Sequence, residues 1–384
     1  MNIAFDAKRA FQNTTGLGHY SRTLIASLAT YFPQHNYYLY APKVTGLFDT
    51  GSFSNIQTVT PLRFPSTVFR SAWRSSLVKE DLKRFGIDLY HGLSHEIPAG
   101  IQKTGIRTVV TMHDLIHERY PQQYNPIDVM IYRKKFRYAC THADIIIAAS
   151  KQTKQDIIDF YKIPGTKIEI CYQSCNSIFA RQVSEDEKRS VRKRYRLPEN
   201  YFLYVGTIIQ RKNLLGICKA LDKVKDTLNL PLVVIGDGGK YKQQVKEYIA
   251  GHNLQQQVIF LSEQPEAKDS SFKSSEDFPA IYQNARALIY PSYFEGFGIP
   301  VLEALCSNLP VITSNQSCLP ETGGDAAYYV NPADTDELAN ALIKVAGDEA
   351  LRQSMITKGR LHAEHFSPKT CAGSVMNVYQ KLLS

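Results

Sequence analysis

Two glutamates eight positions apart, Glu295 and Glu303, lie in a sequence segment that is typical of a ligand-binding site. The apolar run before them predicts a buried strand that ends at Pro291. A helix is expected to start at Pro300, because the missing N–H of proline costs nothing in a first turn. Amides at a helix N-terminus, with glycines that allow close approach, suit the phosphates of a nucleotide. This segment therefore predicts four binding residues, Gly296, Phe297, Gly298 and Ile299.

Each glutamate is assigned one end of such a ligand. Glu303 is expected in the first turn of the helix, where the helix dipole favours a carboxylate. Its two oxygens could accept both hydroxyl groups of a ribose. The alternative for Glu303 is a residue that only complements the dipole. Glu295 is expected to point toward the other end of the ligand.

Two cations, Arg211 and Lys212, follow a second predicted strand and its turn at Gly206. When a nucleoside diphosphate leaves, negative charge develops on the phosphate oxygens, and fixed cations aimed there lower the barrier. Arginine can hold phosphate through two parallel hydrogen bonds, whereas lysine supplies a compact charge. Asn213 is expected to cap the helix that follows. The alternative for the pair is an ordinary solvated basic surface.

A metal ion is considered because Asp334-Thr335-Asp336 has an Asp-x-Asp spacing. These acids open an amphipathic helical pattern after Asn331-Pro332, where capping and the helix dipole both favour carboxylates. We therefore predict that they cap a helix, and we predict no metal site and no cofactor.

Short apolar runs rich in Val, Ile and Tyr alternate with helical patterns along the chain. Continuous rather than alternating runs are typical of strands buried on both faces of a parallel sheet. The first set lies at 2–6, 37–41, 87–91, 107–112, 144–149 and 167–172, and the second at 201–206, 231–236, 257–261, 286–291, 310–313 and 327–330. The pattern predicts an α/β fold of two doubly wound, Rossmann-like parallel-sheet domains that face an interdomain cleft.

The spacing Glu295-x7-Glu303 resembles the signature of retaining family 4 glycosyltransferases, which have the GT-B fold of two Rossmann-like domains. Other motifs match in the family order over nearly the whole chain: Gly16-Leu-Gly18-His-Tyr-Ser, Thr111-Met-His113-Asp114-Leu, Tyr204-Val-Gly206 with Arg211-Lys212-Asn213, Gly236-Asp-Gly and Leu319-Pro-Glu-Thr-Gly. The resemblance implies transfer of a sugar from a nucleoside diphosphate with retention at the anomeric carbon. Similarity to bacterial mannosyltransferase-like members favours GDP-mannose as the donor.

The resemblance also implies roles for single residues. Glu295 would hold hydroxyl groups of the donor, and His113 would contact the transferred sugar, although a lone histidine at a strand end is more often structural. Many family members have an arginine directly after the strand glycine; Thr207 stands there, which leaves Arg211 and Lys212 as the main cations. The predicted catalytic residues are His113, Glu295, Arg211 and Lys212, and the glycines predicted to bind the donor are Gly16, Gly18, Gly206 and Gly236.

Domain limits follow from the restart of the strand pattern after a charged segment at 184–200. We place the acceptor-binding domain at 1–183 and the nucleotide-sugar-binding domain at 184–366. Residues 367–384 are predicted to form a helix that crosses back and packs toward the N-terminal domain, since Ser367-Pro368 is a typical helix start.

A dinucleotide-dependent oxidoreductase is the alternative of a different class. Gly16-Leu-Gly18 follows the first predicted strand, as a dinucleotide fingerprint would. The third glycine of that fingerprint is replaced by Ser21, and no acidic residue ends the second strand, where Tyr40 stands. The sequence therefore disfavours hydride chemistry.

The formal charge of +9 is uneven, because residues 1–200 hold 28 Lys+Arg against 17 Asp+Glu. Phe69, Trp73 and Leu77 repeat at helical spacing beside basic residues, which predicts either a membrane-interface stripe or a helix packed on its own sheet. The predicted membrane or acceptor residues are Arg70, Trp73, Arg74, Arg133 and Lys134. We expect a saccharide acceptor that is lipid-linked, with a soluble saccharide as the rival, and an anionic membrane surface as a further partner. Nucleic acid is not expected, because no aromatic and basic reading motif is present.

The seven cysteines are odd in number and lack the paired spacing of a zinc site, so we interpret them as reduced, mostly buried thiols. No basic leader with an apolar core begins the chain, and no apolar run reaches about 18 residues. We therefore expect a cytoplasmic protein, with peripheral association at the inner face of the cytoplasmic membrane as the open question.

Overall fold

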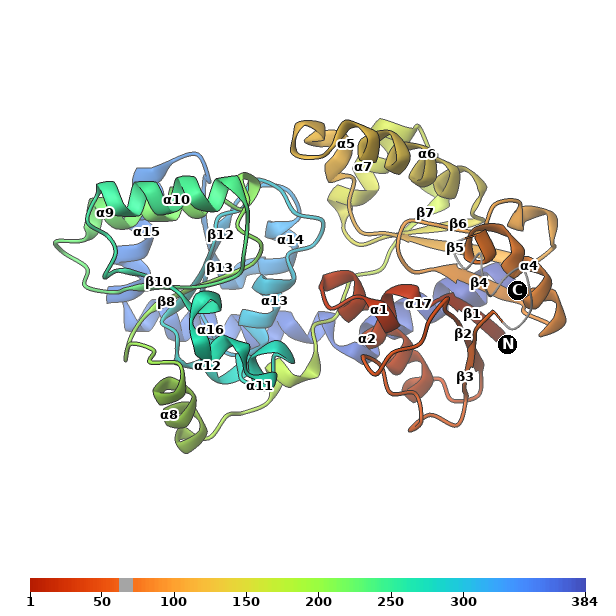
Figure 1. The fold of residues 1–384 in the computed structure, drawn as a ribbon, viewed down its shortest axis with the longest axis horizontal. Helices are drawn as coiled ribbons and strands as arrows, with labels where there is room; N and C mark the ends of the chain where they lie inside the picture. Colours follow the sequence, from red (N-terminus) through yellow and green to blue (C-terminus); the bar gives the residue numbers. More distant parts are fainter. Residues whose placement is uncertain (62–71) are drawn as a thin grey trace. The chain divides into compact units, whose positions relative to one another are not determined.

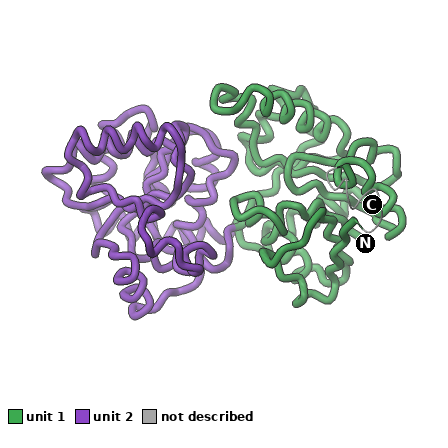
Figure 2. Tube along the Cα trace, in the orientation of Figure 1, with its two compact units in different colours: residues 1–174, 366–384 green, residues 175–365 purple. Residues whose placement is uncertain are grey.

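The structure is a computed structural model that describes residues 1–61 and 72–384. The chain forms two compact units, shown in different colours in Figure 2. Unit 1 comprises Met1–Ser174 together with Phe366–Ser384, and unit 2 comprises Cys175–His365. Each unit has one parallel β-sheet with helices around it, which confirms the predicted α/β class.

Unit 1 has a seven-stranded parallel sheet with the order β3-β2-β1-β4-β5-β6-β7 (Figure 1). The strands are β1 Asn2–Asp6, β2 Asn36–Tyr40, β3 Ile56–Val59, β4 Leu89–Gly92, β5 Arg107–Met112, β6 Ile145–Ala148 and β7 Ile168–Ile170. The helices are α1 Lys8–Gln12, α2 Gly16–Tyr31, α4 Val78–Arg84, α5 Ile116–Arg119, α6 Pro126–His142, α7 Lys151–Tyr161 and α17 Pro368–Leu383. All four residues of β4 are buried, as expected of a central strand covered on both faces.

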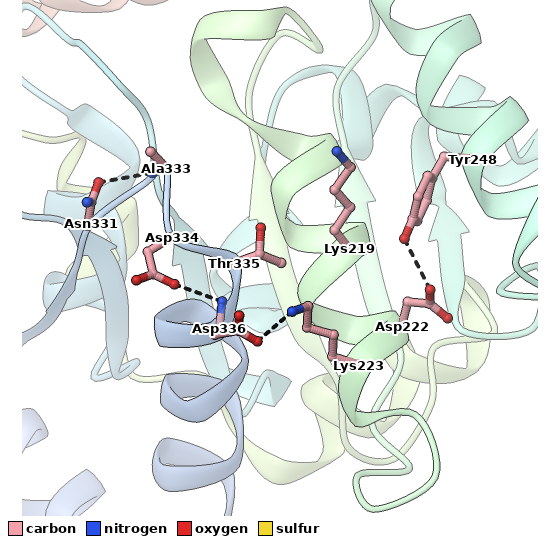
Figure 3. A pocket seen from close by; sticks show the side chains of 9 residues that line it. All are labelled: Lys219, Asp222, Lys223, Tyr248, Asn331, Ala333, Asp334, Thr335 and Asp336. Carbon is pink, nitrogen blue, oxygen red and sulfur yellow. Dashed lines mark hydrogen bonds and ion pairs between the residues drawn. The ribbon is translucent and has the colours of Figure 1, made fainter.

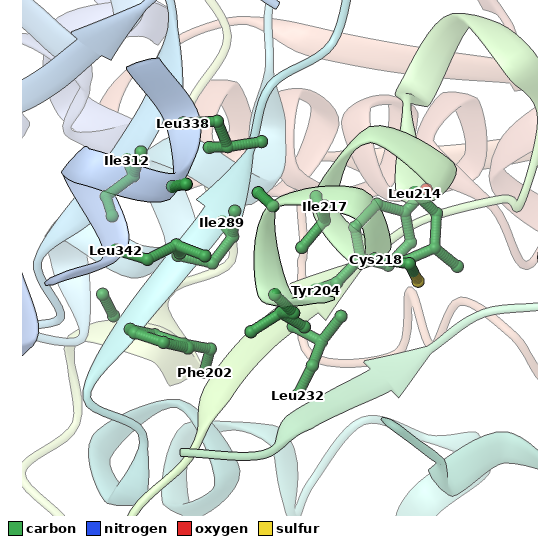
Figure 4. Packing of buried hydrophobic residues seen from close by; sticks show 14 of the residues in the cluster. Phe202, Tyr204, Leu214, Ile217, Cys218, Leu232, Ile289, Ile312, Leu338 and Leu342 are labelled. Carbon is green, nitrogen blue, oxygen red and sulfur yellow. The ribbon is translucent and has the colours of Figure 1, made fainter. Parts of the chain in front are cut away.

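Unit 2 has a six-stranded parallel sheet with the order β10-β9-β8-β11-β12-β13. The strands are β8 Phe202–Val205, β9 Leu232–Ile235, β10 Val258–Phe260, β11 Ala287–Tyr290, β12 Val311–Ser314 and β13 Ala327–Val330. The helices are α8 Glu185–Arg194, α9 Leu214–Val224, α10 Lys240–Gly251, α11 Ser270–Lys273, α12 Phe278–Asn284, α13 Ile299–Cys306, α14 Leu319–Gly323, α15 Thr335–Gly347 and α16 Glu349–Ala363. Figure 4 shows how α9 and α15 pack Ile217 and Leu342 against the sheet residues Tyr204 and Ile289, all four fully buried. This core fixes the strand ends from which the site is built.

All twelve strands predicted from the sequence are present, with ends that differ by at most two residues. The strand β3 was not predicted. Its sequence, Ile-Gln-Thr-Val, places Gln57 and Thr58 among apolar residues, and only Val59 is buried. An edge strand of this kind does not need the continuous apolar run by which the other strands are identified.

The division between the units lies at Ser174, whereas the sequence predicts it at residue 183. Residues after Ser174 are attached to unit 2 by specific contacts. The Phe179 ring lies 5.1 Å from the Tyr282 ring, and Ser307 donates a hydrogen bond of 3.1 Å to the Phe179 carbonyl. The charged segment that suggested a linker forms α8, a surface helix of unit 2 with acidic residues in its first turn and basic residues in its last.

The C-terminal helix α17 belongs to unit 1, where it packs against α2. A chain of buried hydrogen bonds ties it to the sheet. The Tyr379 hydroxyl lies 2.5 Å from Nδ1 of His91, whose Nε2 lies 2.8 Å from the Thr111 hydroxyl. Burial lowers the pKa of His91 to about 3, so this imidazole is neutral and needs one donor and one acceptor.

Replacing Tyr379 by phenylalanine should therefore lower the free energy of unfolding by about 1–3 kcal/mol, because one ring nitrogen of His91 loses its partner in a buried site. Urea unfolding of the full chain measures the effect. Tyr31→Phe is the matched control, since Tyr31 is 43% exposed in the same unit. Equal stability of the two variants would contradict the role assigned to this hydrogen bond.

Candidate active site

The carboxyl ends of the neighbouring strands β8 and β11 bring two cations and one carboxylate together in unit 2. Arg211 and Lys212 lie in a short 3-10 turn after β8, and Glu295 lies in the loop after β11. Oε1 of Glu295 is 2.9 Å from Nη1 of Arg211 and 3.1 Å from Nζ of Lys212. The three side chains are between 7% and 13% exposed, so these charges interact with little screening by water. The sequence-predicted cations and carboxylate thus form one cluster.

Tyr290, the last residue of β11, completes this cluster. Its buried hydroxyl donates a hydrogen bond of 2.9 Å to Oε1 of Glu295 and accepts one of 2.5 Å from Nζ of Lys212. Sequence reasoning did not assign Tyr290 a role, and its place at the end of a strand beside the Glu295 loop was the available signal.

The loop that carries Glu295 is held on two sides by side chains of unit 2. Nη1 of Arg211 donates to the Phe294 carbonyl. On the other side, Ser317 accepts from the Glu295 amide at 3.1 Å and donates to its carbonyl at 2.8 Å. The Thr322 hydroxyl donates to the Phe297 carbonyl. The loop is therefore fixed in position before any ligand arrives.

The charge state of Glu295 follows from its neighbours. Burial alone raises the pKa of this carboxyl, but Lys212 and Arg211 outweigh burial and lower the pKa to about 2. Burial lowers the pKa of Lys212, and the Glu295 carboxylate opposes that effect. Arg211, Lys212 and Tyr290 all contact Oε1, and we expect Oε2 to be the oxygen that accepts a hydrogen bond from a ligand. Glu295 is thus a charged acceptor and cannot supply a proton near neutral pH.

Glu303 lies in the second turn of α13, and the prediction of a first-turn position was wrong. The helix begins at Ile299 with Gly298 as N-cap, at a φ of 96° that favours glycine, and its first turn holds no acidic residue. The partly buried Glu303 accepts a hydrogen bond of 2.8 Å from the Tyr282 hydroxyl. Burial raises the pKa of Glu303 to about 7, and this hydrogen bond opposes that effect only in part. Its carboxyl group is therefore poised to gain or lose a proton near neutral pH.

Comparisons with known proteins match both units. A family model described as "Glycosyl transferases group 1" matches residues 185–362, and a model described as "Glycosyltransferase Family 4" matches residues 14–176. The first range contains Arg211, Lys212, Glu295 and Glu303. The chain belongs to this glycosyltransferase family. It is an enzyme of that class, and the alternative of an oxidoreductase is thereby excluded.

Relatives and solved structures agree with this assignment. O-antigen chain mannosyltransferase B from Escherichia coli is 27% identical over 403 aligned residues, which cover the whole of both chains. O-antigen chain mannosyltransferase RfbU from Salmonella typhimurium is 29% identical over 61% of this chain and 59% of the relative. A glycosyltransferase from Rickettsia africae has the same fold, with a TM-score of 0.73 and 18% identity over 100% of this chain and 98% of that one.

Two glycines, Gly206 after β8 and Gly236 after β9, let the backbones of these neighbouring segments come close together. The turn that carries Arg211 and Lys212 follows Gly206. The Gly206 amide donates to the Ile235 carbonyl at 2.9 Å, and Gly236 lies so close that a Cβ there would be 1.9 Å from the Gly206 carbonyl oxygen. Gly206 and Gly236 also have φ values of 146° and 152°, in the region that favours glycine. These two predicted donor residues therefore have a structural reason to be glycine.

Replacing Gly236 by alanine should cost about 1–3 kcal/mol of unfolding free energy, because the backbone at Gly206, directly after β8, must move away. The shift should also weaken nucleotide binding, since the turn with Arg211 and Lys212 follows β8 directly. Urea unfolding and calorimetric titration with a nucleoside diphosphate measure both effects. Gly251→Ala is the matched control, because a Cβ at Gly251 meets no atom within 4 Å.

Asn213 does not cap α9 through its side chain, contrary to the prediction. The residue has a left-handed backbone with a φ of 59°, and its side chain donates a hydrogen bond of 2.7 Å to the Pro332 carbonyl. It therefore links the cation turn to the loop after β13.

Gly16 and Gly18 lie in the first turn of α2 in unit 1. The Gly18 amide donates to Oδ1 of Asn13 at 3.0 Å and to the Thr15 carbonyl at 2.9 Å. A Cβ at Gly18 would lie 1.9 Å from the Asn13 carbonyl oxygen. This amide is thus bonded within unit 1, and donor binding by Gly16 and Gly18 stays a prediction.

His113 is buried at the end of β5, and both of its ring nitrogens have protein partners. Nε2 lies 2.8 Å from the Leu93 carbonyl and must carry the proton, so Nδ1 accepts from Gln173, also at 2.8 Å. Burial, reinforced by the nearby His95, lowers the pKa of His113 to about 3. The geometry matches the structural role that the sequence left open, and the contact with the transferred sugar stays a prediction.

Of the two alternatives that the sequence left open for Trp73, a membrane-interface stripe or packing on its own sheet, the structure shows packing. Trp73 is 1% exposed, and its indole N–H donates to Asp81 at 2.7 Å. Arg74 is also largely buried, with its guanidinium 2.6 Å from Asp6 and 2.6 Å from Glu96. This tryptophan packs inside unit 1, and the arginine charge is neutralised by two carboxylates. Arg70 lies outside the described residues.

The two other predicted contact residues, Arg133 and Lys134, are exposed on α6. Arg133 forms an ion pair of 2.8 Å with Glu118 while remaining 50% exposed. A helix long and apolar enough to cross a membrane does not occur in the part of the chain that the structure describes.

Asp334 and Asp336 lie in a surface pocket of about 600 Å³ between α9 and the start of α15 (Figure 3). Oδ1 of Asp334 accepts from the amides of Asp336 and Glu337, both at 2.9 Å, which is the capping role that the sequence predicts. Asp336 forms an ion pair with Lys223 at 2.5 Å. Across residues 1–61 and 72–384, no three His, Cys, Asp or Glu side chains are grouped as metal ligands. All seven cysteines are free thiols, and six of them are buried.

Proposed function

We propose that this glycosyltransferase moves mannose from GDP-mannose to a lipid-linked saccharide in the synthesis of a cell-surface polysaccharide. The observation that carries the proposal is the cluster of Arg211, Lys212 and Glu295, which offers two cations and one charged acceptor in a single buried site. The names of the relatives favour mannose, because both are O-antigen mannosyltransferases. The enzyme would work in the cytoplasm, at the inner face of the membrane that holds its acceptor.

The reaction proposed retains the anomeric configuration. The bond between the anomeric carbon and the β-phosphate oxygen breaks, and the acceptor hydroxyl oxygen forms a bond to that carbon from the same face. The β-phosphate oxygen takes the proton of the acceptor hydroxyl, so that GDP leaves with it. Glu295 is unsuited to carry this proton, because its pKa is about 2. Its Oε2 would instead accept from a hydroxyl group of the sugar.

No metal ion is required in this proposal. Arg211 and Lys212 would stabilise the negative charge that develops on the diphosphate, a task that a divalent cation performs in other enzymes. Against the single carboxylate of Glu295, these two residues leave the cluster with a formal excess of one positive charge. Glu303 would hold the ribose at the other end of the donor. A metal-independent enzyme should keep its full rate in the presence of a chelator.

A thermal-unfolding series with GDP, UDP and ADP tests the donor. A nucleotide present at about 100 times its dissociation constant should stabilise the native state by about 2.7 kcal/mol, and GDP is expected to do so. A larger effect of UDP would overturn the assignment of the base. The anomeric configuration of the product, observed by NMR, tests retention, and a sugar covalently attached to Glu295 in a mass spectrum would contradict same-face attack. Equal rates with a soluble saccharide would contradict the lipid-linked acceptor.

A further inference from the structure

The outer surface of α6 has an unusual composition for an exposed helix. Asn125 caps the helix, which turns Val129, Phe136 and Cys140 inward and buries them. An amphipathic surface helix normally has polar residues on its other side. Here the first two turns expose Ile127 by 63%, Met130 by 65% and Ile131 by 40%.

These apolar side chains form one patch rather than scattered positions. Ile127, Met130 and Ile131 are spaced i, i+3 and i+4, so they are neighbours on one side of the helix. Tyr124 and Tyr132 flank them, with ring centres 6.4 Å apart and both side chains 37% exposed. Of the eleven large apolar or aromatic side chains that are exposed among the described residues, these five occupy only nine positions of sequence. Contiguous exposed apolar surface of this kind marks a site of interaction.

The next turn of the same helix is basic. Lys134 follows Met130 and Ile131 at i+4 and i+3, is exposed, and has no partner among the residues that the structure describes. Arg133 stays half exposed although it pairs with Glu118, whereas Lys135 is held by Glu96 at 3.2 Å. The α6 sequence holds four Lys or Arg residues against one acid, Asp128.

The charge of the whole unit favours a lipid partner over a second copy of the chain. Unit 1 carries 23 Lys+Arg against 13 Asp+Glu, a formal charge of +10, while unit 2 carries 22 against 23. Two copies joined through α6 would bring two strongly positive units together, which is unfavourable. An anionic membrane attracts this unit and also accepts apolar side chains and tyrosine at its interface.

We propose that Ile127, Met130, Ile131 and Lys134, called here the α6 face, dock unit 1 on an anionic lipid surface. The inference deepens the proposed function, because a lipid-linked acceptor must be reached at a membrane. It keeps the predicted Lys134 and moves the apolar part of the contact from the buried Trp73 to α6. The apolar residues enter the interface, Lys134 meets the lipid headgroups, and the more distant positive charge of unit 1 strengthens the attraction.

Co-sedimentation of the full chain with vesicles tests the proposal. One set of vesicles is phosphatidylcholine, and the other is phosphatidylcholine mixed with phosphatidylglycerol. The wild type should bind the anionic set preferentially and should bind less as salt rises from about 0.1 M to 1 M, since the Debye length shrinks from about 10 Å to 3 Å. Ile127→Glu with Met130→Glu should weaken binding by at least about tenfold. Lys134→Ala should weaken it by about fivefold, the equivalent of about 1 kcal/mol for one cation near the surface.

The matched control is Ile343→Glu with Leu361→Glu, which places the same charges at exposed apolar positions of unit 2, 44% and 62% exposed. This control should bind vesicles as the wild type does. Failure of the wild type to bind anionic vesicles, or an equal loss in the control, would overturn the proposal. So would a wild-type dimer in solution that the α6 substitutions dissociate. Thermal stabilisation by nucleotide is measured on the same proteins. If the enzyme binds vesicles but no nucleotide stabilises it, the proposed function is contradicted and the docking surface is supported. If a nucleotide stabilises the enzyme but it does not bind vesicles, only the docking surface is contradicted.

Discussion

Replacing Glu295 by glutamine should slow sugar transfer by about a hundredfold to a thousandfold, the usual cost of losing one preorganised electrostatic contact in a buried site. The amide no longer attracts Arg211 and Lys212 through Oε1, and it no longer offers a charged Oε2 to the sugar. Both cations are then released for the diphosphate. GDP should therefore bind to Glu295→Gln at least as tightly as to the wild type. Steady-state rates and calorimetric titration with GDP separate the two effects.

The same substitution should change the dependence of stability on pH. Burial alone raises the pKa of Glu295, but Lys212 and Arg211 lower it from a usual value of 4.5 to about 2. A carboxyl group with a lowered native pKa stabilises the protein above pH 4.5, and this stabilisation is lost as the pH falls toward 2. The difference corresponds to at most about 3 kcal/mol. Urea unfolding should show a deficit for Glu295→Gln near pH 7 that shrinks below pH 4.5.

The exposed residue Glu199 provides the control for both measurements, because the change to glutamine there removes a charge of unit 2 without touching the cluster. Glu199→Gln should match the wild type in rate and in stability. A Glu295→Gln variant that loses GDP binding and transfer in equal proportion would show that Glu295 serves the diphosphate site as a whole rather than the sugar.

The fold was predictable where burial depends on local sequence. Strands covered by helices on both faces need continuous apolar runs, and all twelve such runs are strands in the structure. The edge strand β3 was not predicted, because its outer residues, including Gln57, do not need to be apolar. The unit boundary shifted for a similar reason, since the attachment of Phe179 to unit 2 depends on Tyr282, about a hundred residues later in the chain.

Within the site, the sequence identified groups that follow neighbouring strands but not the partners that set their chemistry. Arg211 and Glu295 meet because β8 and β11 are adjacent and parallel. That Tyr290 bridges this cluster and that Tyr282 holds Glu303 depends on side-chain packing, which spacing does not reveal. Residue type alone also did not show which apolar side chains are exposed. Trp73, a candidate for a membrane contact, is buried, whereas Met130, an ordinary core residue, is exposed.

Glu303 should make the stability of the ligand-free enzyme fall as the pH rises. Burial raises the pKa of this carboxyl from a usual value of 4.5 to about 7. Between these values the unfolded chain has released the proton while the native protein still holds it, so the native state loses stability as the pH increases. Glu303→Gln cannot ionise, and it should be more stable than the wild type near pH 8 by at most about 3 kcal/mol. Below pH 4.5 the two proteins should unfold at similar urea concentrations.

The affinity for GDP should rise with pH as Glu303 loses its proton, whereas the stability of the ligand-free enzyme falls. If the ionised carboxylate accepts from both ribose hydroxyls, the affinity of the wild type rises by up to about tenfold for each pH unit until Glu303 is ionised near pH 7, and then levels off. The terminal phosphate of GDP also titrates near pH 6, but it does so with both proteins, so the difference between wild type and Glu303→Gln isolates the glutamate. Calorimetric titration from pH 5.5 to 8.5 should therefore give a steeper profile for the wild type, together with weaker binding by the variant at every pH above 7. Parallel profiles would mean that GDP binding is not linked to the ionisation of Glu303, which would contradict ribose recognition by its carboxylate and leave the hydrogen bond from Tyr282 as its role.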